Sequence, residues 1–252
     1  MNKTVFITGA TAGFGKASAL LFAANGYNVI INGRRADRLL ALKEQLEKEY
    51  KVAALPLVFD VRDKKAVFDA VATLEGQWKA IDILVNNAGL ALGRDLFDKA
   101  SLDDWETMID TNVKGLLYVS KAVTPLMIAR GKGHVINLGS VAGKEVYEKG
   151  NVYCASKAAV DAITKAIRVD LLPHRIKATA IHPGAAETEF GLVRFKGDAV
   201  TAQKVYDGYK PLSAEDVAGV IYYCASLPDH VCINDLVLTC TAQANSFYTF
   251  RE

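Results

Sequence analysis

The sequence predicts an α/β fold in which helices cover both faces of a doubly wound, seven-stranded parallel sheet. Short β-rich runs alternate along the chain with longer segments whose apolar residues recur every three or four positions. Most of the short runs are continuously apolar, as strands buried on both faces must be. Hydrophobic residues make up 51% of the 252 residues and charged residues 23%, which is typical of a globular protein with a sizeable core.

Strands and helices are expected to alternate along almost the whole chain. The β-rich runs predict seven strands, at Thr4–Thr8, Asn28–Asn32, Ala54–Asp60, Ile81–Asn86, His134–Leu138, Lys177–His182 and Leu236–Leu238. The helical spacing predicts helices at Gly15–Asn25, Asp37–Tyr50, Lys64–Glu75, Ser101–Arg130, Tyr153–Leu171 and Ser213–Ser226. Asp63, Ser101 and Ser213 stand where N-cap side chains accept hydrogen bonds from free backbone N–H groups.

The chain is expected to form a single domain of residues 1–252. No linker rich in proline, glycine or serine divides it, its composition does not change along its length, and no repeat of fixed period is present. Residues 185–211 are the exception to the regular alternation and read as a long irregular insertion between a strand and a helix. Such insertions often act as lids. We therefore expect this segment to cover a bound substrate.

Charge and hydropathy exclude several classes of partner. Thirty lysines and arginines face 28 acidic residues, so the formal charge of +2 does not indicate nucleic acid or an anionic membrane as the main partner. No apolar stretch approaches the roughly 20 residues that a transmembrane helix needs, and the first apolar run is soon broken by glycines. A cytoplasmic protein without membrane contact is expected.

The cysteines and histidines show no metal-site pattern. The cysteines form no CxxC motif and no Cys/His pairs at zinc spacing, so reduced thiols and no metal are expected. The histidines also lack ligand spacing, and packing with ordinary hydrogen bonds is the interpretation that we adopt for them. These residues are Cys154, Cys224, Cys232, Cys240, His134, His174, His182 and His230.

A glycine-rich turn follows the first expected strand and opens a helix. It reads Thr8-Gly9-Ala10-Thr11-Ala12-Gly13-Phe14-Gly15. At such a position the pyrophosphate of a dinucleotide rests against backbone N–H groups and the helix dipole. Its spacing is GxxxGxG rather than GxGxxG, and a purely structural turn would use glycines too. Its place between a strand and a helix favours a Rossmann-type dinucleotide site.

The residues after the second strand distinguish between two cofactors. An acidic residue there would bond the adenosine ribose of NAD. This chain has Gly33 followed by Arg34 and Arg35, whose guanidinium groups pair with a 2′-phosphate. The alternative is that the arginines only begin a solvated helix with Asp37. The adjacent pair favours NADP(H).

Ser140, Tyr153 and Lys157 are spaced for acid–base chemistry. Tyr153 lies 13 residues after Ser140, and the four-residue step to Lys157 stacks tyrosine and lysine on one helix face. A phenol that exchanges protons at neutral pH needs its pKa lowered by about three units, or roughly 4 kcal/mol, which a nearby ammonium can supply. The same spacing occurs by chance on many helices, so it needs support from other motifs.

Those other motifs make the chain resemble the short-chain dehydrogenase/reductase family over essentially its whole length. Residues Thr8 to Gly15 resemble the family's TGxxxGxG turn, and Asn86-Asn87-Ala88-Gly89 its NNAG segment. Tyr153-Cys154-Ala155-Ser156-Lys157 resembles YxxxK, and Pro183-Gly184 resembles the family's PG turn. The resemblance implies a catalytic tetrad of Asn112, Ser140, Tyr153 and Lys157.

Together with the turn and the arginine pair, the resemblance also implies how the residues divide between cofactor and substrate. The cofactor-binding residues are expected to be Gly9, Thr11, Gly13, Phe14, Gly15, Arg34, Arg35, Asp60, Val61, Asn87, Ala88, Gly89, Tyr153, Lys157, Pro183, Gly184 and Thr188. The substrate-binding residues are expected to be Ser140, Tyr147, Tyr153 and Arg194.

Three runs resemble the NADP-dependent serine / 3-hydroxy acid dehydrogenase subgroup, at residues 11–15, 104–112 and 193–198. The resemblance implies NADPH-dependent interconversion of a small anionic aldehyde or ketone, such as malonic semialdehyde, and its hydroxy acid. Residues 144–149 and 185–188 differ from the hydroxy-acid pattern, so sulfoacetaldehyde reduction to isethionate is an alternative. A non-catalytic NADP sensor is a further alternative. A lipid or steroid reductase would need a broadly apolar loop, whereas Arg194 and Glu145 are charged.

Two expectations concern the substrate's anionic end and the assembly. Arg194 is the candidate for a carboxylate or sulfonate because its planar fork matches two oxygens, and Lys196 is its competitor. The resemblance implies a homotetramer, in which residues 247–250 could cover a neighbouring subunit's site. The stripes of Ser101–Arg130 and Tyr153–Leu171 suit either a symmetric interface or the core of a single chain.

Overall fold

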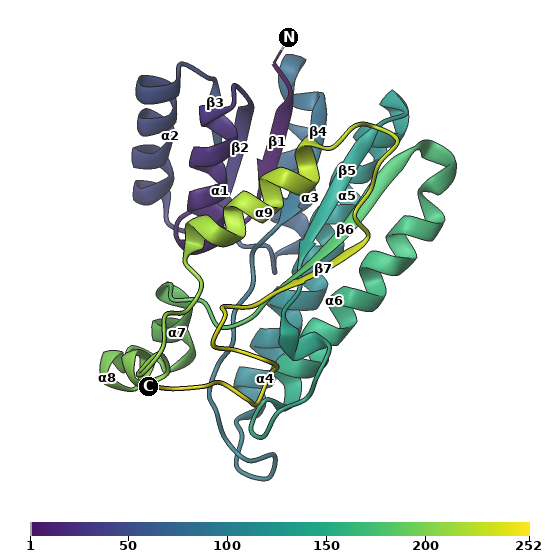
Figure 1. Cartoon of the computed structure of the whole chain (residues 1–252). Helices are drawn as coiled ribbons and strands as arrows, with labels where there is room; N and C mark the ends of the chain where they lie inside the picture. The colour runs from purple at the N-terminus through teal and green to yellow at the C-terminus, as the bar shows by residue number, and fades with distance from the viewer. Residues whose placement is uncertain (1) are drawn as a thin grey trace.

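The structure, a computed structural model, describes residues 2–252, which form a parallel sheet with helices on both faces (Figure 1). Every expected strand is present, with ends within two residues of the expected ones. The strands are β1 Thr4–Ile7, β2 Asn28–Gly33, β3 Ala54–Val58, β4 Ile81–Asn86, β5 Gly133–Leu138, β6 Ile176–Pro183 and β7 Asp235–Leu238. The predicted Rossmann-type fold is confirmed.

The strand order β3-β2-β1-β4-β5-β6-β7 creates a crevice beside β1. The chain runs outward from β1 to β3 and then returns to β4 on the other side of β1, where Ile7 pairs in register with Val85. The helices that follow these two neighbouring strands pack on opposite faces. The carboxyl ends of β1 and β4 therefore border the crevice in which doubly wound sheets bind ligands.

Each face of the sheet has its own apolar core, which explains why the strands are apolar without alternation. In β1, Val5 and Ile7 contribute to one core and Phe6 to the other. The first core is covered by α1 (Gly13–Ala24), α2 (Ala36–Tyr50) and α9 (Ala214–Ser226). The second is covered by α3 (Lys64–Ala72), α5 (Leu116–Arg130) and α6 (Asn151–Asp170). Short 3-10 turns complete the regular elements: η1 (Gly76–Lys79), η3 (Val141–Gly143) and η4 (Leu172–His174).

The three expected N-caps are confirmed. The side chain of Asp63 accepts a hydrogen bond from the backbone N–H of Ala66 at 3.0 Å, and Ser101 caps the helix that follows it. Ser213 forms a reciprocal capping box with Asp216 at the start of α9.

The segment Ser101–Arg130 is not the single helix that its spacing predicts. The structure divides it into α4 (Leu102–Ile109), a π-helical turn η2 (Asp110–Gly115) and α5. The buried side chain of Asn112 in this turn accepts a hydrogen bond from Leu90 N–H and donates one to Leu90 C=O, both at 2.8 Å. This pair of hydrogen bonds to a loop distant in sequence accompanies the π-helical turn η2. Such turns are frequent at functional sites.

Residues 185–211 are not irregular as predicted. They contain two short helices, α7 (Glu189–Arg194) and α8 (Ala199–Lys204), which lie beyond the carboxyl ends of the strands (Figure 1). Both helices begin at side-chain caps, because Thr188 accepts from Phe190 N–H and Asp198 accepts from Thr201 N–H. We call this segment, residues 185–211, the cover.

The C-terminal residues pack against their own chain. Glu252 N–H donates to Gly208 C=O at 2.8 Å, and Ser246 N–H donates to the Glu145 carboxylate at 2.9 Å. Phe247 lines the large cavity of this same chain. Among residues 2–252, no helix is both long and apolar enough to cross a membrane.

Candidate active site

The carboxyl edge of the sheet borders a cavity of about 1140 Å³. Its walls come from the glycine turn, the ends of several strands, the start of α6, the cover and the C-terminal tail. All the site residues expected from the sequence line this cavity except Gly15 and Asn112. Residues that are far apart in the sequence are therefore brought into one site of a size that suits a dinucleotide and a small substrate.

Thr8 joins the glycine turn to the NNAG segment. Its hydroxyl accepts hydrogen bonds from the backbone N–H groups of Asn87 and Ala88, both at 3.0 Å, and the Asn87 amide donates back to the Thr8 carbonyl at 2.9 Å. Gly9 has φ +67°, and a Cβ there would lie 3.0 Å from the Ala88 Cα. A side chain at Gly9 would therefore be strained and would push the two segments apart.

Gly15 does not line the cavity because it packs inside the turn. A Cβ at this position would lie 2.3 Å from the Gly9 carbonyl oxygen. Gly15 thus lets the first turn of α1 approach the end of β1. Ala12, the N-cap residue of α1, has no side chain to bond the free N–H groups. Those groups remain available to an anion at the positive end of the helix dipole.

Arg34 and Arg35 lie at the end of the cavity where β2 ends. The Arg34 side chain is 63% exposed, and its guanidinium stands 3.8 Å from the Asp60 carboxylate. Arg35 crosses toward the glycine turn and donates to the Thr11 hydroxyl at 2.7 Å. Both guanidinium groups therefore line the cavity, with Asp60 between Arg34 and Arg62.

Glu189 connects the cover to Arg35 and Arg38, and the sequence did not predict these contacts. Its carboxylate pairs with Arg35 at 3.1 Å and with Arg38 at 2.7 Å. Burial raises the pKa of Glu189, but the hydrogen bonds from Arg38 and Arg35 outweigh it and hold that pKa below its usual value. These ion pairs thereby hold the first turn of α7 against the start of α2.

Ser140, Tyr153 and Lys157 are brought together where β5 ends against α6. All three are buried. Burial raises the pKa of Tyr153, and the hydrogen bond with Ser140 and the positive charge of Arg194 lower it only in part. Lys157 was expected to lower the Tyr153 pKa, but its ammonium donates to the Leu138 carbonyl at 2.8 Å. Burial lowers the pKa of Lys157 itself to about 8.

Asn112 lies behind the cavity wall. Its amide bonds the backbone of Leu90 and donates to the Ser156 hydroxyl at 3.0 Å. A Cβ at Gly89 would meet the Asn112 amide oxygen at 3.2 Å and the Lys157 ammonium at 3.4 Å. Asn112 and Lys157 thus lie against the same glycine, although Asn112 does not face the cavity.

Arg194 of the cover lies beside two tyrosines. Its guanidinium donates to the Tyr147 hydroxyl at 3.0 Å and is 5.5 Å from the centre of the Tyr153 ring. Lys196, the expected competitor, pairs instead with Asp104 at 2.8 Å and does not line the cavity. Arg94 is a further cation in the cavity wall, and no sequence motif indicated it.

Comparisons with known proteins agree with this geometry. A family model described as short chain dehydrogenase matches residues 3–197. The NADP-dependent 3-hydroxy acid dehydrogenase YdfG of Salmonella typhi is 47% identical over 241 residues, covering 95% of this chain and 96% of that protein. Sulfoacetaldehyde reductase 2 of Chromohalobacter salexigens is 46% identical over 249 residues, covering 98% of each. The closed form of serine dehydrogenase complexed with NADP+ has a TM-score of 0.92 at 44% identity, covering 99% of both chains.

The buried ammonium of Lys157 predicts that Lys157→Met stabilises the cofactor-free protein. A fall in pKa from 10.5 to about 8 means that the charged form destabilises the folded chain by about 3 kcal/mol. Methionine removes that penalty but also the bond to Leu138, so we expect a net gain of roughly 2 kcal/mol at pH 7. Between pH 8 and pH 10.5 the unfolded wild-type chain holds the Lys157 proton more tightly than the folded chain does, so the stability of the wild type rises with pH in this range. The advantage of Lys157→Met over the wild type therefore shrinks as the pH increases.

Urea unfolding of both proteins without cofactor, at pH 7 and pH 9.5, measures this difference. Lys121→Met replaces an exposed lysine on α5 and serves as the control, for which no such gain is expected. A Lys157→Met protein no more stable than the wild type at pH 7 would contradict the prediction.

Proposed function

The chain belongs to the short-chain dehydrogenase family and is an NADP-dependent oxidoreductase; we propose that it interconverts a small anionic aldehyde or ketone and its hydroxy acid. The substrates that we propose are hydroxy acids of the 3-hydroxy acid type, including serine and allo-threonine, and the corresponding oxo acids, such as malonic semialdehyde. The observation that supports this best is the guanidinium of Arg194 beside Tyr153 inside the cavity. A carboxylate bound there would lie close to the proton donor.

The cavity residues suit NADP(H). We assign the pyrophosphate to the glycine turn and the free N–H groups of α1, and the 2′-phosphate to Arg34 and Arg35. When bound, NADPH supplies a hydride to the carbonyl carbon of the substrate. The adenine is assigned to Asp60 and Val61, and the rest of the dinucleotide to Asn87, Ala88, Gly89, Pro183, Gly184 and Thr188.

We assign proton transfer to Tyr153. In the reductive direction its phenol donates a proton to the developing alkoxide, and the Ser140 hydroxyl donates a second hydrogen bond to the same oxygen. The raised pKa of Tyr153 keeps the phenol protonated, which is the state that reduction requires. Lys157 is assigned to the ribose beside the nicotinamide, and Asn112 to a water that resupplies the proton. The cover is assigned to closing the site over the substrate.

Reduction of sulfoacetaldehyde is the second candidate. A sulfonate presents three oxygens to cations where a carboxylate presents two, and this cavity offers Arg94 in addition to Arg194. The 46% identity to a sulfoacetaldehyde reductase also supports it. Competition between malonic semialdehyde and sulfoacetaldehyde, followed by NADPH absorbance, distinguishes the two candidates by their kcat/KM values.

Tyr153→Phe is expected to keep NADPH binding and to lose nearly all turnover, because it removes the proton donor while preserving the ring. General acid catalysis accounts for roughly 10²–10⁴-fold in rate. Tyr223→Phe, which changes an exposed tyrosine outside the cavity wall, is the control and should keep its activity. NADPH consumption measures both variants. A Tyr153→Phe enzyme with the wild-type rate would refute the assignment.

Replacing Arg34 and Arg35 together with alanine is expected to weaken NADPH binding far more than NADH binding. NADH lacks the 2′-phosphate, and each charge-assisted hydrogen bond contributes roughly 1.5–3 kcal/mol. Fluorescence titration of the protein with each cofactor measures the two dissociation constants. Equal weakening for both cofactors would show that the arginines do not contact the 2′-phosphate.

Arg194→Ala is expected to raise KM for malonic semialdehyde and sulfoacetaldehyde by one to two orders of magnitude, or roughly 1.5–3 kcal/mol. An uncharged short aldehyde should be hardly affected, because it has no anionic group to bind. Lys196→Ala, a charge removal on the same segment but outside the cavity, is the matched control. If charged and uncharged substrates suffer alike, Arg194 has a structural role and the anion binds elsewhere.

A further inference from the structure

His182, to which the sequence assigned no role, lies directly behind Ser140. It is fully buried on β6, immediately before Pro183. Its ring packs on Gly139, where a Cβ would lie only 2.4 Å from the ring Nδ1. Strands β5 and β6 pair up to Leu138 and Ile181, so the next residues of both strands lie side by side. Gly139 thus makes room for the imidazole under the Ser140 peptide.

The Nδ1 atom of His182 is 3.2 Å from the backbone carbonyl oxygen of Ser140. A carbonyl only accepts hydrogen bonds, so a bond here requires the proton on Nδ1. The same oxygen also accepts from Gly143 N–H at 2.9 Å, within the turn that follows. The Ser140 hydroxyl accepts from Ala142 N–H at 3.1 Å. His182 thus ties this turn to the neighbouring strand, together with the Ser140 hydroxyl, which donates to the Pro183 carbonyl at 3.5 Å.

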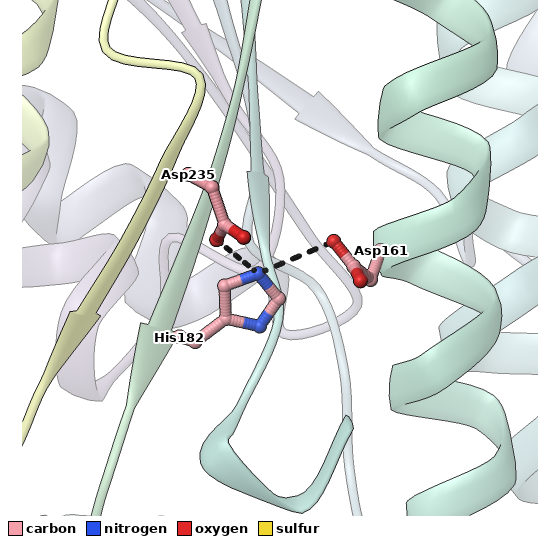
Figure 2. Close-up of side chains that lie close together, drawn as sticks. All are labelled: Asp161, His182 and Asp235. Atoms are coloured by element: carbon pink, nitrogen blue, oxygen red, sulfur yellow. Dashed lines mark ion pairs between the residues drawn. The ribbon is translucent and has the colours of Figure 1, made fainter. Parts of the chain in front are cut away.

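The other ring nitrogen, Nε2, faces two carboxylates and a lysine. Figure 2 shows Asp235 and Asp161 approaching it from two sides, at 3.0 Å and 3.7 Å. The Lys144 ammonium lies 3.1 Å from Asp161 and 2.5 Å from Asp235, and Lys165 pairs with Asp161 at 2.8 Å. We call Lys144, Asp161 and Asp235 the acid–lysine cluster. Asp161, His182 and Asp235 could together hold a metal ion, but Lys144 already supplies a cation between the two carboxylates.

The contacts of Nε2 indicate which nitrogen is protonated. Nε2 makes no hydrogen bond within the described residues, although the Asp235 carboxylate is 3.0 Å away, so the two groups are close but not aligned for a hydrogen bond. Burial and the charge of Lys144 lower the pKa of His182, which favours a neutral ring with a single proton. A proton on Nε2 would leave the Nδ1 lone pair facing the Ser140 carbonyl. The form with the proton on Nδ1 avoids this repulsion, and on the other side of the ring the Lys144 ammonium offsets the negative charge of Asp235 and Asp161 that the Nε2 lone pair faces.

The acid–lysine cluster connects His182 to the helix that carries the reactive residues. Asp161 follows Lys157 by four residues on α6, one helical turn further along the same face. Lys144 follows Ser140 by four residues, just after the turn η3. The Ser140 turn is thus anchored at two points, at the Ser140 carbonyl by His182 and at Lys144 by the two carboxylates. Neither His182 nor the acid–lysine cluster lines the cavity.

We propose that His182 is a positioning residue for the reaction: its Nδ1–H holds the Ser140 peptide so that the Ser140 hydroxyl faces Tyr153, and the Lys144 ammonium, paired with both carboxylates, weakens their attraction for a proton on Nε2. This inference rests on the role proposed above for Ser140. His182 touches neither substrate nor cofactor and acts through the Ser140 turn. Misplacement of a reacting group by about 1 Å lowers rates by roughly 10²-fold, so kcat is the parameter that should respond.

Two amide substitutions separate the ring nitrogens. In His182→Asn the amide N–H takes the place of Nδ1–H, and in His182→Gln it takes the place of Nε2–H. We expect His182→Asn to keep kcat within about threefold, and His182→Gln to lose roughly 30- to 100-fold in kcat with KM for NADPH unchanged. His134, another buried histidine bonded through Nε2, gives the matched control, and His134→Gln should leave kcat unchanged. Thermal unfolding of each variant with NADP+ checks that it is folded.

The outcomes distinguish this inference from the proposed function. If Ser140→Ala keeps the wild-type rate, the role proposed for Ser140 is wrong. If Ser140→Ala is inactive while His182→Asn and His182→Gln both keep kcat, His182 does not position Ser140. Equal losses in both amide variants, accompanied by a lowered Tm, would show a purely structural role and would also overturn the inference.

A measurement on the unmodified protein covers the case in which the His182 variants do not fold. Nitrogen NMR of the histidine-labelled holoenzyme reports which ring nitrogen carries the proton, and His134→Gln assigns the other buried histidine. We expect His182 to be protonated on Nδ1 only, and Lys144→Met to shift the proton toward Nε2. A wild-type His182 protonated on Nε2 would overturn the inference whatever the variants do.

Discussion

Parallel pairing of β1 with β4 is the constraint on which the rest of the site depends. Because all strands run the same way, their carboxyl ends meet at one edge, and the return of the chain to β4 opens the crevice at this pair. The Thr8 hydroxyl, which accepts from both Asn87 and Ala88, ties the two strand ends together. Without that link the glycine turn and the NNAG segment would not form one wall.

The polar residues of the site share one mode of anchoring. Asn112 bonds the backbone of Leu90, Lys157 bonds the carbonyl of Leu138, and His182 bonds the carbonyl of Ser140. These backbone groups lie at or just beyond strand ends, where the sheet supplies no further ladder partner. Buried backbone groups need partners, and buried polar side chains need them as well. The edge of the sheet satisfies both requirements and holds the side chains in place.

The cover is attached at both ends of the cavity. Glu189 bonds two arginines at the end assigned to the adenosine, and Arg194 reaches Tyr147 at the end assigned to the substrate. One short helix, α7, carries both residues. The contacts at the cofactor end and the guanidinium that we assign to the substrate's anion are therefore joined by six consecutive residues. This arrangement also leaves Lys196 outside the cavity, paired with Asp104.

Local patterns were sufficient to predict the strands, most helices and the caps, because each of these depends on spacing within a few neighbouring residues, which periodicity and turn chemistry record. Most of the expected site residues came instead from the resemblance to a known family. The same patterns predicted one helix over Ser101–Arg130, because the bond that accompanies the π-turn joins Asn112 to Leu90, 22 residues away. Local patterns also failed to predict two other contacts: the ion pair of Glu189 with Arg35, and the approach of Asp161 and Asp235 to His182. They join side chains from different elements, and no local spacing records a contact that forms only when the sheet and its helices pack together.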